Sequence, residues 1–323
     1  GSSLSSPGVA LLSPGVALSS PASLLVKGND GDAAVTLERF ATELDYPECP
    51  RWHDGALWIS EMWSRAVVRF DDTGRRQVVH QFTDDQPGGL GWLPDGGLVV
   101  VGMESRLLHR MYPDPAGSGL YADLTATTPW ALNDMVIGKT GHAYVSQVGF
   151  DLADAASRPA PSPVIHVDDR GAVSVAAEGL VVPNGMALSG DGETLVVAET
   201  FGGRLTAFTV CPDGSLDDRR VLAELPPAPD HRYARPDGIC LDEEDAAWVA
   251  DWRGCQVLRV SADGTVVRRI PSPTHALAVV LGGPERRTLF ICTSRHMVRP
   301  GPDAWPEGAV FTLDVDVPGA GEP

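Results

Sequence analysis

The amino-acid sequence predicts an all-β chain that folds as a six-bladed β-propeller with four antiparallel strands per blade. One pattern occurs six times: a polar loop end, a short apolar run, a turn and a second apolar run. A repeat of about 40–50 residues that holds four short strands is typical of propeller blades. No long helical period of apolar residues is visible along the 323 residues.

The six units begin at polar residues or glycine, at Glu48, Gly89, Asn133, Asn184, Asp237 and His275. In the first unit, residues 56–60 form the second apolar run, and residues 67–70 and 77–79 supply two further strands around a turn. The longer units match inserted loops at residues 151–163 and 226–235, and the sequence leaves the role of the first insertion open.

The ends of the chain differ from the repeats. Residues 1–34 are rich in Ser, Pro and Gly and contain a short duplication, so we expect a flexible leader. Residues 35–318 form the single propeller domain, and residues 319–323 are expected to be a flexible tail. Segments 35–42 and 309–317 both have the pattern of strands. We expect them to share the last blade and close the ring, which leaves little exposed sheet edge.

Charge and cysteine content narrow the class of protein. The net charge of −18 argues against nucleic acid and anionic membranes as partners, because phosphates require Lys and Arg. No apolar run approaches the roughly 18 residues of a membrane helix. The five cysteines contain no C-x-x-C motif, which fits a reducing, cytoplasmic setting. The expected partner is a small-molecule substrate, and the oligomeric state stays open.

The first residues of the units predict a metal site. In a propeller, the residues that begin the innermost strands face the same end of the axial channel, so Glu48, Asn133, Asn184 and Asp237 should converge. Carboxylate and carboxamide oxygens suit a hard cation, Ca²⁺ or another divalent ion, better than zinc or copper. The alternative is that Asn184-Gly185 and Asp237-Gly238 are ordinary turn dipeptides.

Several of these segments resemble one known family. They are similar to the regucalcin/gluconolactonase family of calcium-binding propeller hydrolases over roughly residues 44–315. The segments that carry the resemblance are Glu48-Cys-Pro-Arg-Trp, Asn133-Asp134, Pro183-Asn-Gly-Met-Ala-Leu-Ser-Gly-Asp-Gly, Pro236-Asp-Gly-Ile-Cys-Leu-Asp and Gly282-Gly-Pro-Glu-Arg-Arg-Thr-Leu-Phe.

The resemblance implies roles for the converging residues. Glu48, Asn184 and Asp237 would be direct metal ligands, and Asn133 would be a fourth ligand or would contact both metal and substrate. Asp237 would also be the general base or nucleophile. Family members that act on sugar-acid lactones carry an arginine where this chain has Ala131, and the neighbouring Trp130 indicates a more apolar substrate.

The predicted function is metal-dependent hydrolysis of a cyclic ester, a lactonase reaction. The cation would polarise the carbonyl group, Asp237 or a water molecule would supply the nucleophile, and His275 would move protons. Two alternatives remain open at this stage: a biosynthetic cyclase, lyase or isomerase that uses the same metal pocket, and a calcium-binding propeller without catalysis. Polar residues after the second strands, such as Glu61, Glu199 and Asp251, are expected at the far end from the metal or partway into the channel, as polar groups of solvated turns or of the channel wall.

Overall fold

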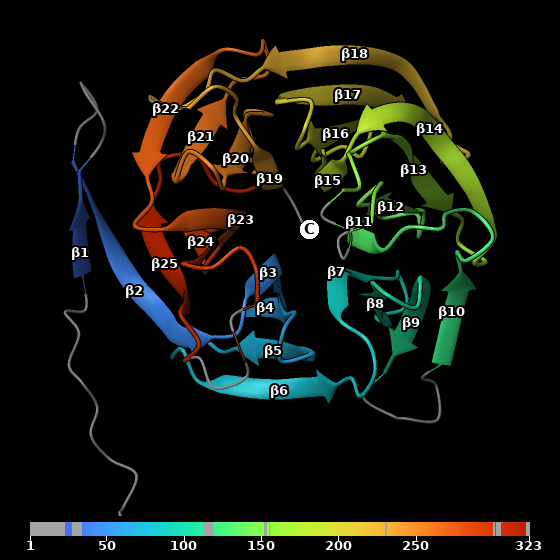
Figure 1. Cartoon of the computed structure of the whole chain (residues 1–323), viewed down its shortest axis with the longest axis horizontal. Helices are drawn as coiled ribbons and strands as arrows, with labels where there is room; N and C mark the ends of the chain where they lie inside the picture. The colour runs from blue at the N-terminus through green and yellow to red at the C-terminus, as the bar shows by residue number, and fades with distance from the viewer. Residues whose placement is uncertain are drawn as a thin grey trace, which may run out of the picture.

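The computed structural model describes residues 23–27, 34–112, 119–151, 154, 156–229, 231–299, 301 and 305–320. These residues form six antiparallel sheets arranged around a central axis, as Figure 1 shows. The predicted six-bladed propeller is confirmed. No helix occurs among the residues described, and so none is long and apolar enough to cross a membrane.

The first three blades follow one another along the chain. Blade 1 contains β3 (Pro47–His53), β4 (Ala56–Glu61), β5 (Ala66–Phe70) and β6 (Arg76–Gln81). Blade 2 contains β7 (Pro87–Trp92), β8 (Leu98–Gly102), β9 (Leu107–Met111) and β10 (Gly119–Asp123). Blade 3 contains β11 (Leu132–Ile137), β12 (Ala143–Gln147), β13 (Pro161–Val167) and β14 (Val173–Val181).

The remaining blades complete the ring. Blade 4 contains β15 (Pro183–Leu188), β16 (Thr194–Glu199), β17 (Arg204–Val210) and β18 (Leu216–Glu224). Blade 5 contains β19 (Pro236–Leu241), β20 (Ala247–Asp251), β21 (Gln256–Val260) and β22 (Val266–Pro271). Blade 6 contains β23 (His275–Gly282), β24 (Thr288–Ser294), β25 (Gly308–Asp314), β2 (Val35–Leu44) and β1 (Ser23–Val26).

Strands close to the axis are more buried than the outermost strands. Every residue of β8, β12 and β20 is buried, because these second strands lie between neighbouring blades. Every residue of the outermost strand β6 is exposed. The hydrophobic core is therefore a set of layers between blades. Continuous apolar runs such as Val99-Val100-Val101 suit strands that are covered on both faces.

The ends of the chain close the ring in blade 6. Strand β2 pairs with β25 from Glu38 opposite Thr312 to Leu44 opposite Gly308, which confirms the predicted shared sheet. The flexible leader predicted for residues 1–34 is wrong for Ser23–Val26, which adds the outer strand β1 alongside β2. The N–H and C=O groups on the free edge of β2 bond to β1, and this explains the extra strand. Residues 1–22 and 28–33 lie outside the described residues.

The C-terminal segment lies across one end of the axial channel. The N–H group of Gly319 bonds to the carbonyl oxygen of Arg286 at 2.9 Å, and that of Ala320 bonds to Leu241 at 3.0 Å. The expected flexible tail at residues 319–323 is therefore wrong for these first two residues, and residues 321–323 are not described. A small cavity of about 40 Å³ at this end is lined by residues of the innermost strands and by Ala320. The channel is thus covered at the end where the innermost strands finish.

Closure by β2 generates a stability prediction. Leu37 is fully buried between blades 5 and 6, whereas Leu25 in β1 is 61% exposed. Leu37→Ala should lower the free energy of unfolding by about 2–5 kcal/mol, the usual cost of emptying a buried leucine site. Leu25→Ala, the matched control, should change it by less than about 0.5 kcal/mol. Urea denaturation of both variants measures this, and equal losses would contradict closure through β2.

Candidate metal centre

A β-bulge interrupts every innermost strand close to the residue that begins the unit. The pairing with the second strand shifts between Glu48 and Arg51 in β3, and corresponding shifts occur in β7, β11, β15, β19 and β23. A bulge bends a strand and redirects one side chain. Asn184-Gly185 and Asp237-Gly238 therefore lie inside bulged strands and are not turn dipeptides.

Glycine at these bulges lets neighbouring blades approach closely. A Cβ atom on Gly185 would lie 2.5 Å from the carbonyl oxygen of Asp237, and one on Gly238 would lie 2.3 Å from the Cβ of Ala278. Any larger residue would push the blades apart. The glycines that follow Asn184 and Asp237 thus allow neighbouring blades to lie close together at the level of the site.

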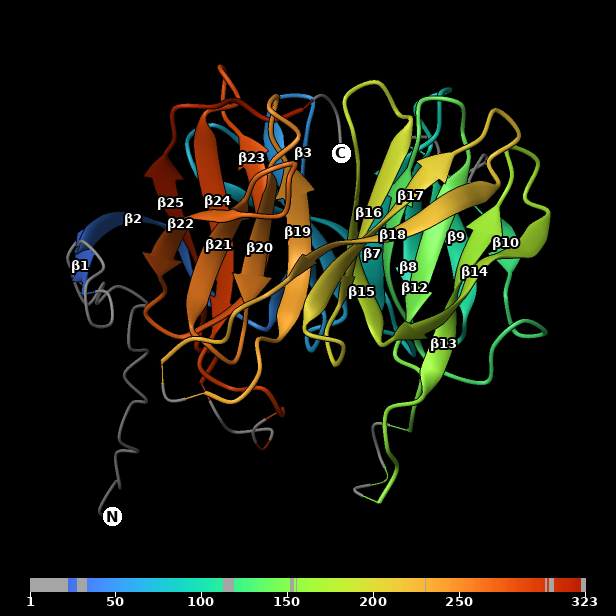
Figure 2. The same ribbon diagram turned by 90° about the horizontal axis from the view of Figure 1, so that it is seen from above.

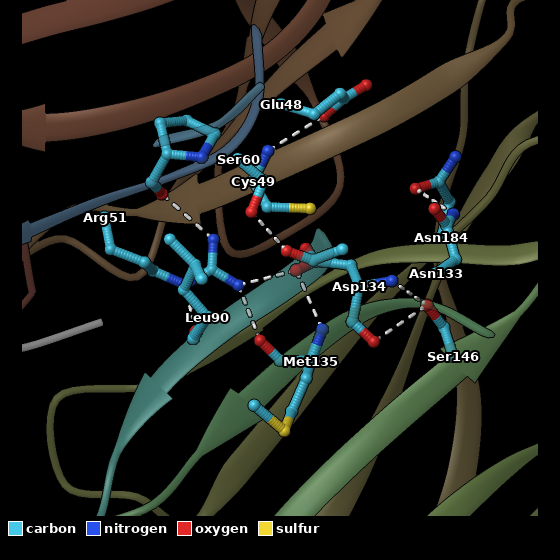
Figure 3. Close-up of polar contacts among 12 residues, drawn as sticks. Glu48, Cys49, Arg51, Ser60, Leu90, Asn133, Asp134, Met135, Ser146 and Asn184 are labelled. Atoms are coloured by element: carbon cyan, nitrogen blue, oxygen red, sulfur yellow. Dashed lines mark hydrogen bonds and ion pairs between the residues drawn. The ribbon is translucent and has the colours of Figure 1, made fainter. Parts of the chain in front are cut away.

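The structure brings the four predicted oxygen donors together at one end of the channel. Asn133 Nδ2 donates to Asn184 Oδ1 at 2.8 Å, and Asn184 also bonds to the carboxylate of Asp237. The charges of Glu48 and Asp237 act on each other. Figure 3 shows Glu48 and the Asn133–Asn184 pair. No measurement tests their role as metal ligands, which stays a prediction.

A threonine that sequence reasoning missed orients Asn184. Asn184 Nδ2 donates to Thr200 Oγ1 at 3.1 Å, and Thr200 Oγ1 donates to the carbonyl oxygen of Pro236 at 2.7 Å. This contact fixes the amide nitrogen of Asn184, while its Oδ1 accepts the hydrogen bond from Asn133. Pro183 pairs with Glu199, and the N–H group of Thr200 bonds to the carbonyl oxygen of Val182, so Thr200 directly follows the paired strand end. Repeat spacing gave no signal for its contact with Asn184.

Glu48 and Asp237 are buried carboxylates with no ion-pair partner within 4 Å in the described structure. Burial raises the pKa of Glu48 to about 8, and the charge of Asp134 adds to the rise, although the N–H group of Cys49 and the charge of Arg51 oppose it. Burial, and then the charge of Glu48, raises the pKa of Asp237 well above its usual value. Two such groups are stable in their ionised form only with a positive charge close by.

Asp134 is a third buried carboxylate, and it already has its counter-ion. Arg51 Nη2 lies 2.7 Å from Asp134 Oδ1, and both side chains are buried (Figure 3). The guanidinium also donates to the carbonyl oxygens of Pro50, Leu90 and Met135. Arg51 therefore ties blades 1, 2 and 3 together below the site. Sequence reasoning missed this role, because the partners are 83 residues apart.

His275 lies at the edge of this group. Its Nδ1 is 2.8 Å from the carbonyl oxygen of Trp252. A carbonyl only accepts hydrogen bonds, so Nδ1 carries the proton, and Nε2 of the neutral ring keeps a free lone pair. His275 has no hydrogen bond to the four oxygen donors among the contacts of the described residues. Its catalytic role stays a prediction.

Aromatic side chains surround the same end of the channel. Trp130 is half-buried in the loop before β11, three residues before Asn133, and its role in substrate binding is untested. Tyr46, which precedes β3, stacks on Trp63 with ring centroids 4.4 Å apart. Burial, followed by the charges of Glu48 and Asp237, raises the pKa of Tyr46 well above its usual value.

The polar residues after the second strands lie at the metal end, so the expectation that they lie at the far end from it is wrong. Antiparallel pairing sets Glu61 opposite Pro47, Glu199 opposite Pro183 and Asp251 opposite Pro236. Each carboxylate is buried and hydrogen-bonded, as in the Glu199–Arg204 ion pair and the bond from the N–H group of Val181 to Glu199. They stabilise the loops around the site and are already neutralised or fully hydrogen-bonded.

The donor set fits a hard divalent cation. It offers two carboxylates and two carboxamides, and oxygen ligands of this kind suit calcium. In the described part of the chain, no three His, Cys, Asp or Glu side chains gather as a metal cluster would require. The five cysteines are free thiols and none lies among the four donors. This chemistry does not favour zinc or copper.

Comparison with known proteins places the chain among lactonases. It is 34% identical over 281 residues to a 6-deoxy-6-sulfogluconolactonase of Pseudomonas putida, which covers 85% of this chain and 93% of the relative. It is 27% identical over 286 residues to a pentonolactonase of Haloferax volcanii, with 85% and 92% covered.

A solved structure shows the same fold. It is a gluconolactonase of Xanthomonas campestris, matched with a TM-score of 0.69 at 24% identity over 87% of this chain and 89% of that one. Residues 46–295 match the model of the SMP-30/gluconolactonase/LRE-like region. This match spans all six innermost strands and the four converging oxygen donors, and the chain therefore belongs to the SMP-30/gluconolactonase/LRE-like family.

Proposed function

We propose that the chain is a calcium-dependent hydrolase of lactones. The observation that carries the proposal is the pair of buried, unpaired carboxylates, Glu48 and Asp237, beside Asn133 and Asn184 at the uncovered end of the channel. The lactonases named among the relatives support lactone hydrolysis as the reaction. The fit of four oxygen donors to a hard cation supports calcium.

A bound calcium ion would polarise the lactone carbonyl and stabilise negative charge on its oxygen. Asp237 has two carboxylate oxygens, so one oxygen can face the cation while the other accepts a proton from the attacking water molecule. The new C–O bond forms at the carbonyl carbon, and the ring C–O bond breaks. The departing ring oxygen then takes a proton, which His275 Nε2 can relay.

Residues close in sequence to the oxygen donors bear on the polarity of the substrate. The family resemblance implies that Ala131 stands where members acting on sugar-acid lactones carry an arginine. Trp130 and the stacked Tyr46–Trp63 pair lie close in the sequence to Asn133 and Glu48 and offer apolar surface. We therefore propose a lactone with an apolar flank. The sulfogluconolactonase and the pentonolactonase act, by name, on sugar-derived lactones, so these compounds belong in the same assay.

The unpaired carboxylates generate a prediction about stability. Asp237→Asn keeps the shape of the side chain but removes one buried negative charge. We expect the calcium-free variant to be more stable than the natural chain by about 1 kcal/mol or more, because burial of an uncompensated charge is costly. Thermal unfolding with EDTA and with calcium measures this. The calcium-induced rise in Tm should shrink in the variant.

The exposed carboxylate Asp72 provides the matched control. Asp72→Asn removes the same charge from the surface and should leave both melting temperatures unchanged. If Asp237→Asn lowers the calcium-free Tm, or keeps the full calcium response, Glu48 and Asp237 do not form the proposed centre.

The reaction itself generates a second prediction. The chain should hydrolyse apolar δ-lactones or glucono-δ-lactone with calcium, lose activity in EDTA, and recover it when calcium is restored. Asp237→Asn should lower kcat by about 10²-fold or more even at saturating calcium, because a general base contributes on that scale. His275→Ala should cost less. A pH-stat or hydroxylamine assay measures the rates.

Two outcomes of this assay would contradict the proposed reaction, and each would favour a different alternative. Normal turnover by Asp237→Asn with calcium bound would exclude Asp237 as the reacting group. Tight calcium binding without turnover of any lactone would favour the non-catalytic propeller or a different reaction at the same pocket.

A further inference from the structure

A second pocket of about 400 Å³ lies at the same end of the propeller as the candidate metal centre. It is formed by the turn after β16, the segment before β19 and the turn after β20, at the end where β19 begins (lower edge of Figure 2). We call it the Arg235 pocket. Its walls combine three arginines with three aromatic side chains, Arg232, Arg235, Arg253, Phe201, Tyr233 and Trp252.

Three short connections join this pocket to the candidate centre. Phe201 follows Thr200, which bonds to Asn184. Trp252 provides the carbonyl oxygen that bonds to His275. Arg235 lies two residues before Asp237, so their Cα atoms are within about 7 Å of each other. A small molecule whose ester group lies at the metal centre can therefore extend into the Arg235 pocket.

The positive charges of this pocket have no carboxylate partners. Neither Arg232, Arg235 nor Arg253 forms an ion pair with any residue that the structure describes, although the chain has 43 acidic and 25 basic residues. The buried carboxylate nearby, Asp251, bonds to the N–H groups of Arg235 and Gly254 and to the Gln256 side chain. Burial, and then the charge of Arg253, lowers the pKa of Arg235.

Aromatic rings hold the Arg235 side chain in position. Its guanidinium carbon lies 4.8 Å from the ring centroid of Phe201 and 5.2 Å from that of Tyr233. Stacking uses the flat faces of the guanidinium and leaves its in-plane N–H groups available. Of its five donors, one bonds to the carbonyl oxygen of Ala234, and the other four have no acceptor among the described residues. Such a group is preorganised to bind an anion.

We propose that the Arg235 pocket binds an anionic group at the end of the substrate remote from the ester, and so selects lactones that carry a carboxylate, sulfonate or phosphate. This inference rests on the proposed lactone hydrolysis and deepens it by naming the substrate class. Arg235 and Arg253 bind the anion, and Phe201 and Trp252 cover the adjoining apolar part. The apolar flank that we propose beside Trp130 is a different part of the substrate from this anionic end.

The test compares matched lactones on the calcium-loaded chain. One pair is an alkyl δ-lactone and the same compound with a terminal carboxylate, and the other pair is glucono-δ-lactone and its 6-phosphate. The natural chain should prefer the anionic member of a pair by kcat/KM. This preference should fall about tenfold or more in Arg253→Ala and in Arg235→Gln, because each removes charge-assisted hydrogen bonds. It should also weaken as salt is raised.

Arg170→Ala is the matched control, since Arg170 is an exposed arginine in the turn between β13 and β14, at the opposite end of the propeller. It should leave the preference unchanged. Arg235→Lys keeps the charge and should retain part of the preference. Arg253 is exposed, so its variant tests the pocket without disturbing the core. An unchanged preference in both Arg253→Ala and Arg235→Gln would overturn the proposal.

A binding measurement separates failure of this proposal from failure of the proposed reaction. If no lactone is hydrolysed, calorimetric titration with the open-chain carboxylate and phosphate products still reports on the pocket. Binding of either product that weakens about tenfold in Arg253→Ala, but not in Arg170→Ala, supports the anion site. Equal binding of the product by the natural chain, Arg253→Ala and Arg170→Ala would exclude the anion site. Absence of binding to all three would exclude it as well.

Discussion

Mutual repulsion among buried carboxylates is the constraint on which the rest of this structure depends. The ring brings Glu48, Asp134 and Asp237 to one axis, and all three side chains are buried. Arg51 neutralises Asp134 and bonds to the backbones of three blades. Glu48 and Asp237 remain without a counter-ion beside two carboxamides, and burial raises the pKa of both groups. In the proposed function, a divalent cation at that place would balance their ionised forms and supply a Lewis acid for ester hydrolysis.

Backbone irregularity makes this arrangement possible. A regular strand alternates its side chains, whereas the bulges of the innermost strands redirect single residues near the start of each strand. Cys49, which follows Glu48, has a positive φ of 48°, an uncommon conformation for a residue other than glycine. Gly185 and Gly238 allow the backbones to meet closely. The site is therefore built into the most constrained part of the ring.

The two ends of the propeller differ in their chemistry. The C-terminal segment covers the end where the innermost strands finish, and Ala320 lines a cavity of about 40 Å³. The opposite end carries the oxygen donors, the stacked Tyr46–Trp63 pair and the unpaired arginines of the Arg235 pocket. A chain with a net charge of −18 thus presents local positive charge beside its candidate centre, which favours an anionic substrate there.

The six repeating units could be predicted from the sequence, because apolar runs and turn residues act locally and repeat in phase. The same phase was sufficient to predict that Glu48, Asn133, Asn184 and Asp237 share one end of the channel. Which charges are neutralised could not be predicted, because it depends on contacts between distant segments. Arg51 meets Asp134 across 83 residues, and Thr200 bonds both Asn184 and the backbone before Asp237. Contacts between blades depend on bulges, register and ring radius, and repeat spacing does not encode these quantities.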